Sequence, residues 1–303
     1  MSEKGKVVLA YSGGLDTSCL LKYLQDEGYD VVSCIAALGQ PSEERKDIDA
    51  VNEKAKMLGA VAAYDVDIRD EFCEDFVAKA IFANGMYENK YPLLSALSRP
   101  AICRHLVKVA QAEGAVAIAH GCTGKGNDQV RFELECKALD PTLDILGPVR
   151  SWELTTRSSE IEYAQSHGIP VDATKENPYS IDENVWGRAI ECGVLEDPWN
   201  SAPDGAWSLT VNAEDAPDEA RDVVIGFEAG LPVSIDGQRM KLYDLIAALN
   251  KIVGSHGFGR IDMIEDRLVG LKSRECYEQP GALAIIMAHK QLESLCLPGD
   301  VLH

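Results

Sequence analysis

The sequence predicts an α/β fold in which a doubly wound parallel-sheet domain is followed by a second, α+β domain. Short β-branched runs alternate with amphipathic stretches through the first half, as is typical of a parallel sheet with helices on its faces. Beyond about residue 170, turn residues interrupt this alternation and antiparallel-looking runs follow. With 303 residues and 46% hydrophobic content, the chain is long enough for two domains with their own cores.

The first domain, expected at residues 1–170, is predicted to consist of strands that are each followed by a helix. We expect strands at 7–11, 31–38, 61–66 and 115–119, and helices at 16–27, 47–58, 71–83 and 100–113. Strands that alternate with helices in this way favour one open, doubly wound sheet.

The second domain, expected at residues 171–303, begins where Gly168-Ile169-Pro170 and Asn177-Pro178 break the regular pattern. Proline-containing turns continue the interruption up to about residue 217. We expect antiparallel strands at 206–211, 223–228 and 233–236, and helices at 242–253 and 282–295. This half therefore reads as α+β.

Composition excludes several classes of function. A formal charge of −20 and a pI near 4.7 would repel nucleic acid and anionic membranes, so neither is an expected partner. The nine cysteines are scattered without a CxxC pair, which argues against both a disulfide framework and a zinc site and suits a reducing cytoplasm. We find no signal-peptide pattern and no apolar run long enough to span a bilayer. A cytoplasmic protein without a protein-bound metal is the expectation.

The strongest local motif is AYSGGLDTS at residues 10–18, between the first expected strand and the first expected helix. Gly13 and Gly14 allow a tight turn whose N–H groups, together with the positive end of the helix, face one point and make an anion site. Asp16 is placed to hold a hydrated Mg²⁺ ion against phosphate oxygens. Additional hydroxyl donors are Ser12, Thr17 and Ser18. Because GxxxxGK[ST] is absent, this is a phosphate loop of another kind; the alternative is a capped Gly-Gly turn.

A second glycine-rich segment, HGCTGKGNDQVRFE at residues 120–133, follows the expected strand at 115–119. Loops at the carboxyl ends of parallel strands converge on one crevice, so both segments should face the same site. Lys125 is a flexible charge that can reach phosphate, while Asp128 and Arg131 offer partners for an ammonium and a carboxylate. Charges of both signs suit zwitterionic amino acids. A solvated charged loop is the alternative.

These motifs carry a family resemblance. SGGLDTS resembles the PP-loop of ATP pyrophosphatases, which cut ATP between the α and β phosphates. Together with HGCTGKGNDQVRFE, it makes the chain similar to the argininosuccinate synthase family. The similarity continues in order through NPYSIDEN at 177–184, GRID at 259–262, EDR at 265–267, GLKSR at 270–274 and YE at 277–278.

The resemblance implies an ATP- and Mg²⁺-dependent ligase of arginine biosynthesis. Citrulline would be adenylated on its ureido oxygen, and the amine of aspartate would then displace AMP to give argininosuccinate; no covalent or acid–base catalytic residue is implied. The residues implied to surround ATP are Ala10, Tyr11, Ser12, Gly13, Gly14, Leu15, Asp16, Thr17, Ser18, Ala36 and Gly121. Those implied to hold aspartate are Thr123, Asn127 and Asp128. Those implied to hold citrulline are Tyr91, Asn127, Arg131, Ser180, Glu265 and Tyr277.

The sequence departs from the family pattern at a few positions. Leu94-Ser95 stands where relatives often have Gly-Thr, and Ala96 and Ala189 stand where some members have serines near citrulline, so neither alanine is placed in the site. Family chains normally run on past residue 303. The family is a homotetramer, so we expect a homo-oligomer here, shortened at its C-terminus and more weakly assembled.

Two other functions remain open at this point. The first is a different PP-loop enzyme that thiolates tRNA or forms amides; a thiolating enzyme would be expected to carry paired cysteines and a basic surface. The second is a non-catalytic module that senses ATP. A requirement for both amino acids before AMP is released would separate the ligase from either one.

Overall fold

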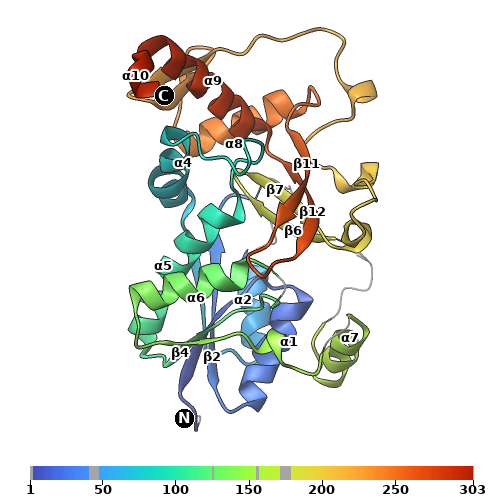
Figure 1. Ribbon diagram of the computed structural model, residues 1–303. Helices are drawn as coiled ribbons and strands as arrows, with labels where there is room; N and C mark the ends of the chain where they lie inside the picture. The colour runs from blue at the N-terminus through green and yellow to red at the C-terminus, as the bar shows by residue number, and fades with distance from the viewer. Residues whose placement is uncertain (1–2, 41–47, 125, 155–156, 171–178, 303) are drawn as a thin grey trace.

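The computed structural model describes residues 3–40, 48–124, 126–154, 157–170 and 179–302. Figure 1 shows a parallel sheet with its helices at the N-terminal end of the molecule and an antiparallel sheet packed with α8 and α9 at the other end. Among the described residues, no helix is both long and apolar enough to cross a membrane.

The parallel sheet has five strands, in the order β3-β2-β1-β4-β5. Their bounds are β1 Lys6–Ala10, β2 Asp30–Ala37, β3 Ala62–Asp67, β4 Ala117–Ala119 and β5 Asp144–Leu146. The chain moves outward from β1 to β3 and then returns to place β4 on the opposite side of β1. Ligands of open α/β sheets bind at such a reversal, beyond the carboxyl ends of the strands. The predicted fold class is confirmed.

The three central strands, β1, β2 and β4, are largely buried because helices cover both faces of the sheet. Val7 and Leu9 pack with α1, α2 and α7, whereas Val8 packs with α5 and α6. This alternation follows from the two-residue period of a strand. The helical bounds are α1 Leu15–Asp26, α2 Ile48–Met57, α3 Arg69–Glu71, the π-helical η1 Phe72–Val77, α4 Ala78–Phe82, α5 Ser95–Glu113, α6 Asp128–Leu139 and α7 Arg157–Ser166.

The four predicted strands and four predicted helices of this half are confirmed, with two instructive differences. The helix expected at 100–113 begins at Ser95, because the Leu94 carbonyl accepts the N–H groups of Leu97 and Ser98 before Pro100 is reached. The segment treated as a loop up to residue 133 becomes helical at Asp128. β5 and α7 were not predicted.

The second half contains two antiparallel sheets. The four-stranded sheet has the order β11-β12-β7-β6, and the three-stranded sheet has the order β10-β9-β8. The strand bounds are β6 Ser180–Asn184, β7 Gly187–Glu191, β8 Ile225–Glu228, β9 Leu231–Ile235, β10 Gln238–Arg239, β11 Arg260–Asp266 and β12 Lys272–Glu278. The helices are α8 Leu242–Gly254, α9 Pro280–Cys296 and α10 Gly299–Leu302, and the 3₁₀ turns are η2 Pro148–Arg150, η3 Gly193–Glu196, η4 Asp204–Ala206 and η5 Ala213–Asp215.

The prediction of a strand at 206–211 is wrong. The backbone N–H groups of Ser208, Leu209 and Thr210 donate to the buried carboxylate of Glu278 at 2.9–3.1 Å, so they are not available for a sheet ladder. The runs at 223–228 and 233–236 do form strands, β8 and β9, and the two predicted helices are confirmed as α8 and α9. β6, β7, β11 and β12 were not predicted.

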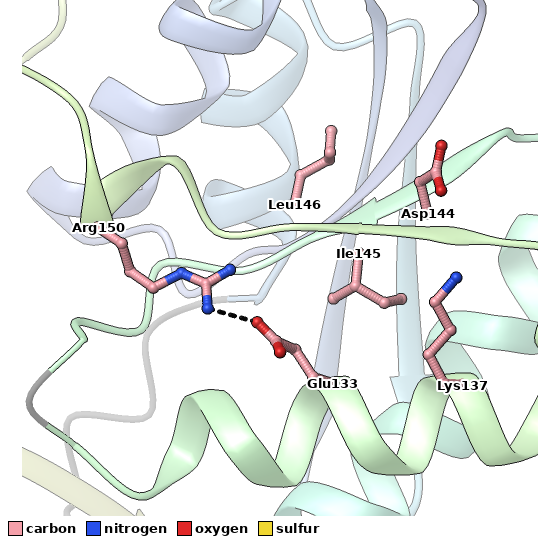
Figure 2. A pocket seen from close by; sticks show the side chains of 6 residues that line it. All are labelled: Glu133, Lys137, Asp144, Ile145, Leu146 and Arg150. Carbon is pink, nitrogen blue, oxygen red and sulfur yellow. Dashed lines mark ion pairs between the residues drawn. The ribbon is translucent and has the colours of Figure 1, made fainter. Parts of the chain in front are cut away.

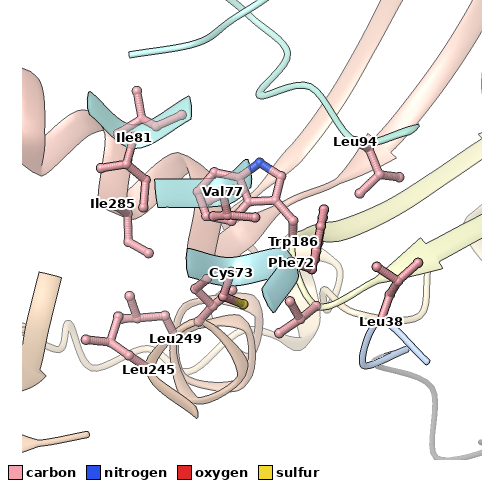
Figure 3. Close-up of a cluster of buried hydrophobic side chains, with 14 of the residues drawn as sticks. Leu38, Phe72, Cys73, Val77, Ile81, Leu94, Trp186, Leu245, Leu249 and Ile285 are labelled. Atoms are coloured by element: carbon pink, nitrogen blue, oxygen red, sulfur yellow. The ribbon is translucent and has the colours of Figure 1, made fainter. Parts of the chain in front are cut away.

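One hydrophobic cluster joins the two halves. Figure 3 shows Phe72, Val77 and Ile81 of the first half packed with Trp186 and Leu249 of the second. A buried hydrogen bond also crosses here, because the Val185 N–H donates to the Leu38 carbonyl. The antiparallel sheet is therefore fixed over the carboxyl end of the parallel sheet.

Candidate functional site

The loop after β1 has the geometry of a tight turn. Gly13 has φ +73°, and a Cβ there would lie 2.8 Å from Cγ1 of Val51, so only glycine fits without a shift. Lys54 of α2 donates its Nζ to the Gly13 carbonyl at 3.0 Å. Gly14 precedes the twelve-residue helix α1, whose N-terminus directs backbone N–H groups toward this turn.

The hydroxyl groups of this loop face two different ways. The Ser12 and Thr17 hydroxyls lie 3.1 Å apart in an exposed position on the loop. Ser18 is fully buried; its hydroxyl donates to the Gly14 carbonyl at 2.6 Å and lies 3.1 Å from the hydroxyl of Tyr11. Ser18 and Tyr11 therefore stabilise the turn from its buried side, while backbone groups, Ser12 and Thr17 lie on its exposed side.

The loop after β4 packs directly against the first loop. The Cβ position of Gly121 lies 3.6 Å from Cγ2 of Thr17, which is ordinary contact distance. Ala10 ends β1, while Ala36 lies near the end of the neighbouring strand β2. The predicted ATP residues thus gather at the reversal of strand order, although Lys125 lies outside the described residues.

Asp128 begins α6 and lies between two guanidinium groups. Arg99 donates its Nε to Oδ2 at 2.8 Å, and Arg131 donates Nη1 to Oδ1 at 2.6 Å. Burial alone would raise the pKa of Asp128, but the positive charges of Arg99 and Arg131 outweigh it and lower that pKa. Thr123 precedes this cluster in an exposed position. The site is therefore a mixed-charge centre.

Arg99 was not identified from the sequence, because an arginine in an amphipathic helix is more often a solvated surface residue. Its guanidinium also forms an ion pair with Asp182 of β6, whose Oδ2 accepts the Ser95 hydroxyl at 2.6 Å. Its side chain is only 16% exposed. Arg99 thus connects the second loop of the parallel sheet to the antiparallel sheet.

One face of the antiparallel sheet lines the other side of this centre. Strand pairing places Glu265 opposite Ser273 and Tyr277 opposite Ala189, while Ser180 lies opposite Glu191. Because side chains alternate along a strand, positions paired in this way share a face. That face carries Ser180, Asp182, Ala189, Glu191, Glu265, Ser273, Glu275 and Tyr277.

Two tyrosines and two glutamates meet at this face, with Tyr91 contributed by the segment that precedes α5. The rings of Tyr91 and Tyr277 stack with centroids 3.9 Å apart. The Tyr277 hydroxyl lies 2.5 Å from Oε1 of Glu265 and 2.7 Å from Oε2 of Glu275. Burial, followed by the charge of Glu275, raises the pKa of Glu265 to about 7.

The hairpin of β11 and β12 reaches down to the second loop. The Leu268 N–H, at the hairpin turn, donates to Oδ1 of Asn127 at 2.8 Å. Asn127, Asp128 and Arg131 lie within five consecutive residues, and the positive charge of Arg131 is close enough to Glu265 to lower its pKa against the effect of burial. The structure therefore brings the residues predicted for the two amino acids into one region, with Ser180 exposed at its margin.

A separate pocket of about 380 Å³ lies at the β5 edge, between that strand and α6 (Figure 2). Three of its charged groups, Glu133, Lys137 and Arg150, are engaged with one another or with backbone. Arg150 pairs with Glu133 at 2.5 Å, and Lys137 donates to the Leu143 carbonyl at 2.6 Å. It contains none of the predicted site residues.

Comparisons with known proteins agree with the geometry. Residues 6–170 match the family model described as the arginosuccinate synthase N-terminal HUP domain, and residues 179–303 match the arginosuccinate synthase C-terminal domain. Similar relatives named argininosuccinate synthase come from Geobacillus thermodenitrificans (55% identical over 98% of this chain and 72% of the relative) and Halalkalibacterium halodurans (55%, over 100% and 73%). Another comes from Bacillus subtilis (54%, over 100% and 74%).

Proposed function

The chain belongs to the argininosuccinate synthase family, and from that membership we propose how its residues share the work of the reaction. The reaction is the ATP-dependent ligation of citrulline and aspartate to argininosuccinate, with release of AMP and pyrophosphate. It is a carbon–nitrogen ligase activity of arginine biosynthesis.

ATP is proposed to lie over the loop after β1, with its β and γ phosphates at the N-terminus of α1. Support comes from the Gly13 turn, from the backbone N–H groups that follow it, and from Gly121 packed beside Thr17. Ala10 and Ala36 would contact the nucleoside from the two adjacent strands. Preorganised donors at this position stabilise the pyrophosphate as negative charge develops on it.

Mg²⁺ is proposed to accompany ATP. Asp16, in the first turn of α1, would supply a carboxylate oxygen, and the phosphates would supply the others. No group of three metal-binding side chains occurs among the residues that the structure describes. Such a ligand set would fit a Mg²⁺ ion that is coordinated mainly by the phosphates of the nucleotide.

The two amino acids are proposed to meet at Asp128. Its carboxylate would receive the ammonium of aspartate, with Thr123 and Asn127 alongside. Arg131 would hold the carboxylate of citrulline, with Ser180 at the margin, while its ureido group would lie against Tyr91, Glu265 and Tyr277. The single observation that carries this arrangement is that Asp128 and Arg131 are bonded to each other at 2.6 Å between the ATP loop and the glutamate-bearing face.

The chemistry needs no covalent intermediate with the protein. The ureido oxygen attacks the α phosphate, pyrophosphate leaves, and the amine of aspartate attacks the activated carbon, expelling AMP. The protein contributes proximity and orientation, which are worth several kcal/mol in such reactions. Glu265 is placed to accept ureido N–H groups and so to orient the nucleophilic oxygen.

We further propose a division into an ATP-binding domain at 1–170 and a synthetase domain at 171–303, a homo-oligomeric assembly, and a cytoplasmic location. The location is supported by nine cysteines without paired spacing.

The proposal is tested by measuring nucleotide products with each substrate omitted in turn. We expect AMP and pyrophosphate in equal amounts only when ATP, citrulline and aspartate are all present. ADP as the main product would refute it, and AMP released with ATP alone would favour another PP-loop enzyme.

A further inference from the structure

The Tyr277 hydroxyl is within hydrogen-bond distance of two carboxyl groups. Glu265 Oε1 lies 2.5 Å away on β11, and Glu275 Oε2 lies 2.7 Å away on β12. Both distances lie at the short end of the range for O–H···O hydrogen bonds. Neither the family resemblance nor the sequence motifs assign a role to Glu275.

The number of hydrogens limits how these three groups can be bonded. A tyrosine hydroxyl has one proton, and an ionised carboxylate only accepts hydrogen bonds. If both glutamates were ionised, one of the two contacts would bring lone pairs face to face without a proton between them. The arrangement therefore requires a second proton, carried by one of the two carboxyl groups.

The surroundings decide which glutamate carries it. Glu275 accepts the Ser273 hydroxyl at 2.7 Å and lies 3.3 Å from Nη2 of Arg267, so its oxygens already face a hydrogen-bond donor and a positive charge. Glu265 is only 7% exposed, and burial disfavours its ionised form. The proton therefore belongs on Glu265, which donates to the Tyr277 oxygen, while the Tyr277 hydroxyl donates to Glu275.

We propose that Glu275 is a specificity-determining residue that acts through Tyr277 to keep Glu265 a neutral carboxylic acid. The part of the site formed by Glu265 then prefers the neutral ureido group of citrulline to a guanidinium cation. The inference rests on the proposed position of citrulline beside Glu265. Arginine has nearly the same shape as citrulline and differs at this end by its positive charge. An ionised Glu265 would attract that cation, whereas the neutral acid offers it no ion pair.

Other charged and titratable groups surround the pair on every packed element. Arg131 on α6 and Arg267 at the hairpin lower the pKa of Glu265, while on β7 the charge of Glu275 raises the pKa of Glu191. Charged and titratable groups that face this region are Tyr91, Asp128, Arg131, Asp182, Glu191, Cys192 and Arg267. The hydrogen bonds of the Tyr277 hydroxyl join Glu265 and Glu275 directly, whereas the residues named above act on the pair through their charges.

The protonation state is tested first, without any ligand. Carbon-13 NMR of the protein with glutamate carboxyl labels, with the Glu265 signal assigned by its loss in Glu265→Gln, should show this carboxyl protonated at pH 6 and titrating near neutral pH. In Glu275→Gln the titration should move at least about one unit lower, because the second negative charge is gone. A Glu265 signal that is ionised throughout, or that is unmoved in Glu275→Gln, overturns the proposal.

Specificity is tested next by calorimetric titration with citrulline and with arginine at pH 6.5. Glu275→Gln should lower the preference for citrulline over arginine by about tenfold, the factor carried by one unit of pKa. The matched control is Glu191→Gln, which removes a carboxylate from the same sheet face with the same Arg267 partner and should keep the preference. An equal loss in both variants would show a general charge effect and refute a special role for Glu275.

The two measurements separate this inference from the proposed function. If neither amino acid binds to the protein, the proposed function fails while the NMR titration still reports on the proton. If citrulline binds and the preference is unchanged in Glu275→Gln, the specificity role fails and the proposed function stands.

Discussion

Asp128 lies between Arg99 and Arg131, so its negative charge is compensated before any substrate arrives. In the proposed arrangement, the ammonium of aspartate would compete with two guanidinium groups for this carboxylate. This explains how a buried acid can remain ionised. It also means that a change at Asp128 alters the position of both arginines.

We accordingly predict that Asp128→Asn raises the KM for aspartate by about tenfold to a hundredfold. This corresponds to the loss of one charged hydrogen bond, roughly 1.5–3 kcal/mol. Arg131→Ala should act mainly on the KM for citrulline, and steady-state kinetics with each amino acid varied in turn measures both.

Because the two residues are bonded to each other, their effects should not add. The double variant Asp128→Asn/Arg131→Ala should lose less than the sum of the single variants, as is usual for residues in one ion-pair network. Unchanged KM values for both amino acids in both single variants would contradict the assignments.

Glu265 gives a prediction about the pH dependence of stability. Its folded-state pKa, about 7, is raised above the ordinary value of 4.5, so between these values the native state holds a proton that the unfolded state has lost. Stability should therefore fall as pH rises toward 7 and level off above it. Glu265→Gln removes this penalty and should stabilise the ligand-free protein more at pH 8 than at pH 5, by about 2–3 kcal/mol. Urea unfolding at the two pH values measures the difference, and an equal effect at both would be inconsistent with a raised pKa.

At the scale of elements, a carboxylate takes the place of a strand partner. Glu278 ends β12 and is fully buried, where it accepts three consecutive backbone N–H groups, the Thr210 hydroxyl and Arg188. This side chain fixes segment 208–210 without a sheet ladder. Arg188 also donates its Nη1 to the Ala206 carbonyl. The Glu278–Arg188 pair therefore contacts both ends of segment 206–210.

We predict that Glu278→Gln destabilises the protein by about 3–5 kcal/mol, because it leaves Arg188 with less compensation in a buried position. The denaturant midpoint measures this loss, and hydrogen exchange at residues 208–210 should become faster. Glu228→Gln is the matched control, since Glu228 pairs with Arg239 in an exposed position and its change should leave the midpoint in place. Similar effects of the two changes would argue against Glu278 as the anchor.

The same scale shows what the sequence could predict. Strands β1 to β4 and the helices α1 to α5 were found because most of their buried positions are apolar, as in Val7, Val8 and Leu9. β11 and β12 were missed because the buried positions on their site-facing side include polar residues, such as Glu265. α6 was missed because glycines precede it and its first residues are charged.

The residues of the candidate site also fall into two groups, those that the sequence could name and those that it could not. The residues of the two glycine-rich loops stand in contiguous motifs, so the sequence could name them. Arg99, Asp182 and Glu275 lie on ordinary-looking elements far apart in the chain, and only strand register and helix packing bring them together. Long-range neighbours of this kind leave no local pattern.

At the scale of the whole molecule, the two halves share a core. Phe72, Val77 and Ile81 belong to the first half, but they are buried against Leu245, Leu249 and Ile285 of the second half (Figure 3). The ion pair between Arg99 and Asp182 and the hydrogen bond between Leu268 and Asn127 cross the same boundary. Family boundaries near residue 170 therefore do not separate two independent hydrophobic cores.

We predict from this shared core that both halves unfold in a single transition, although chains of this length often unfold in steps. Phe72→Ala should lower the free energy of unfolding by about 3–5 kcal/mol, because its ring is fully buried at the junction. The unfolding transitions of both halves should shift together. Hydrogen exchange near the unfolding midpoint, followed at β1 in one half and at β12 in the other, measures the two separately. Equal losses of protection indicate one cooperative unit, since opening either half would expose the apolar surface of the other to water. If β12 lost protection while β1 kept it, the parallel-sheet domain would be stable alone, and the shared cluster would be a docking interface rather than a common core.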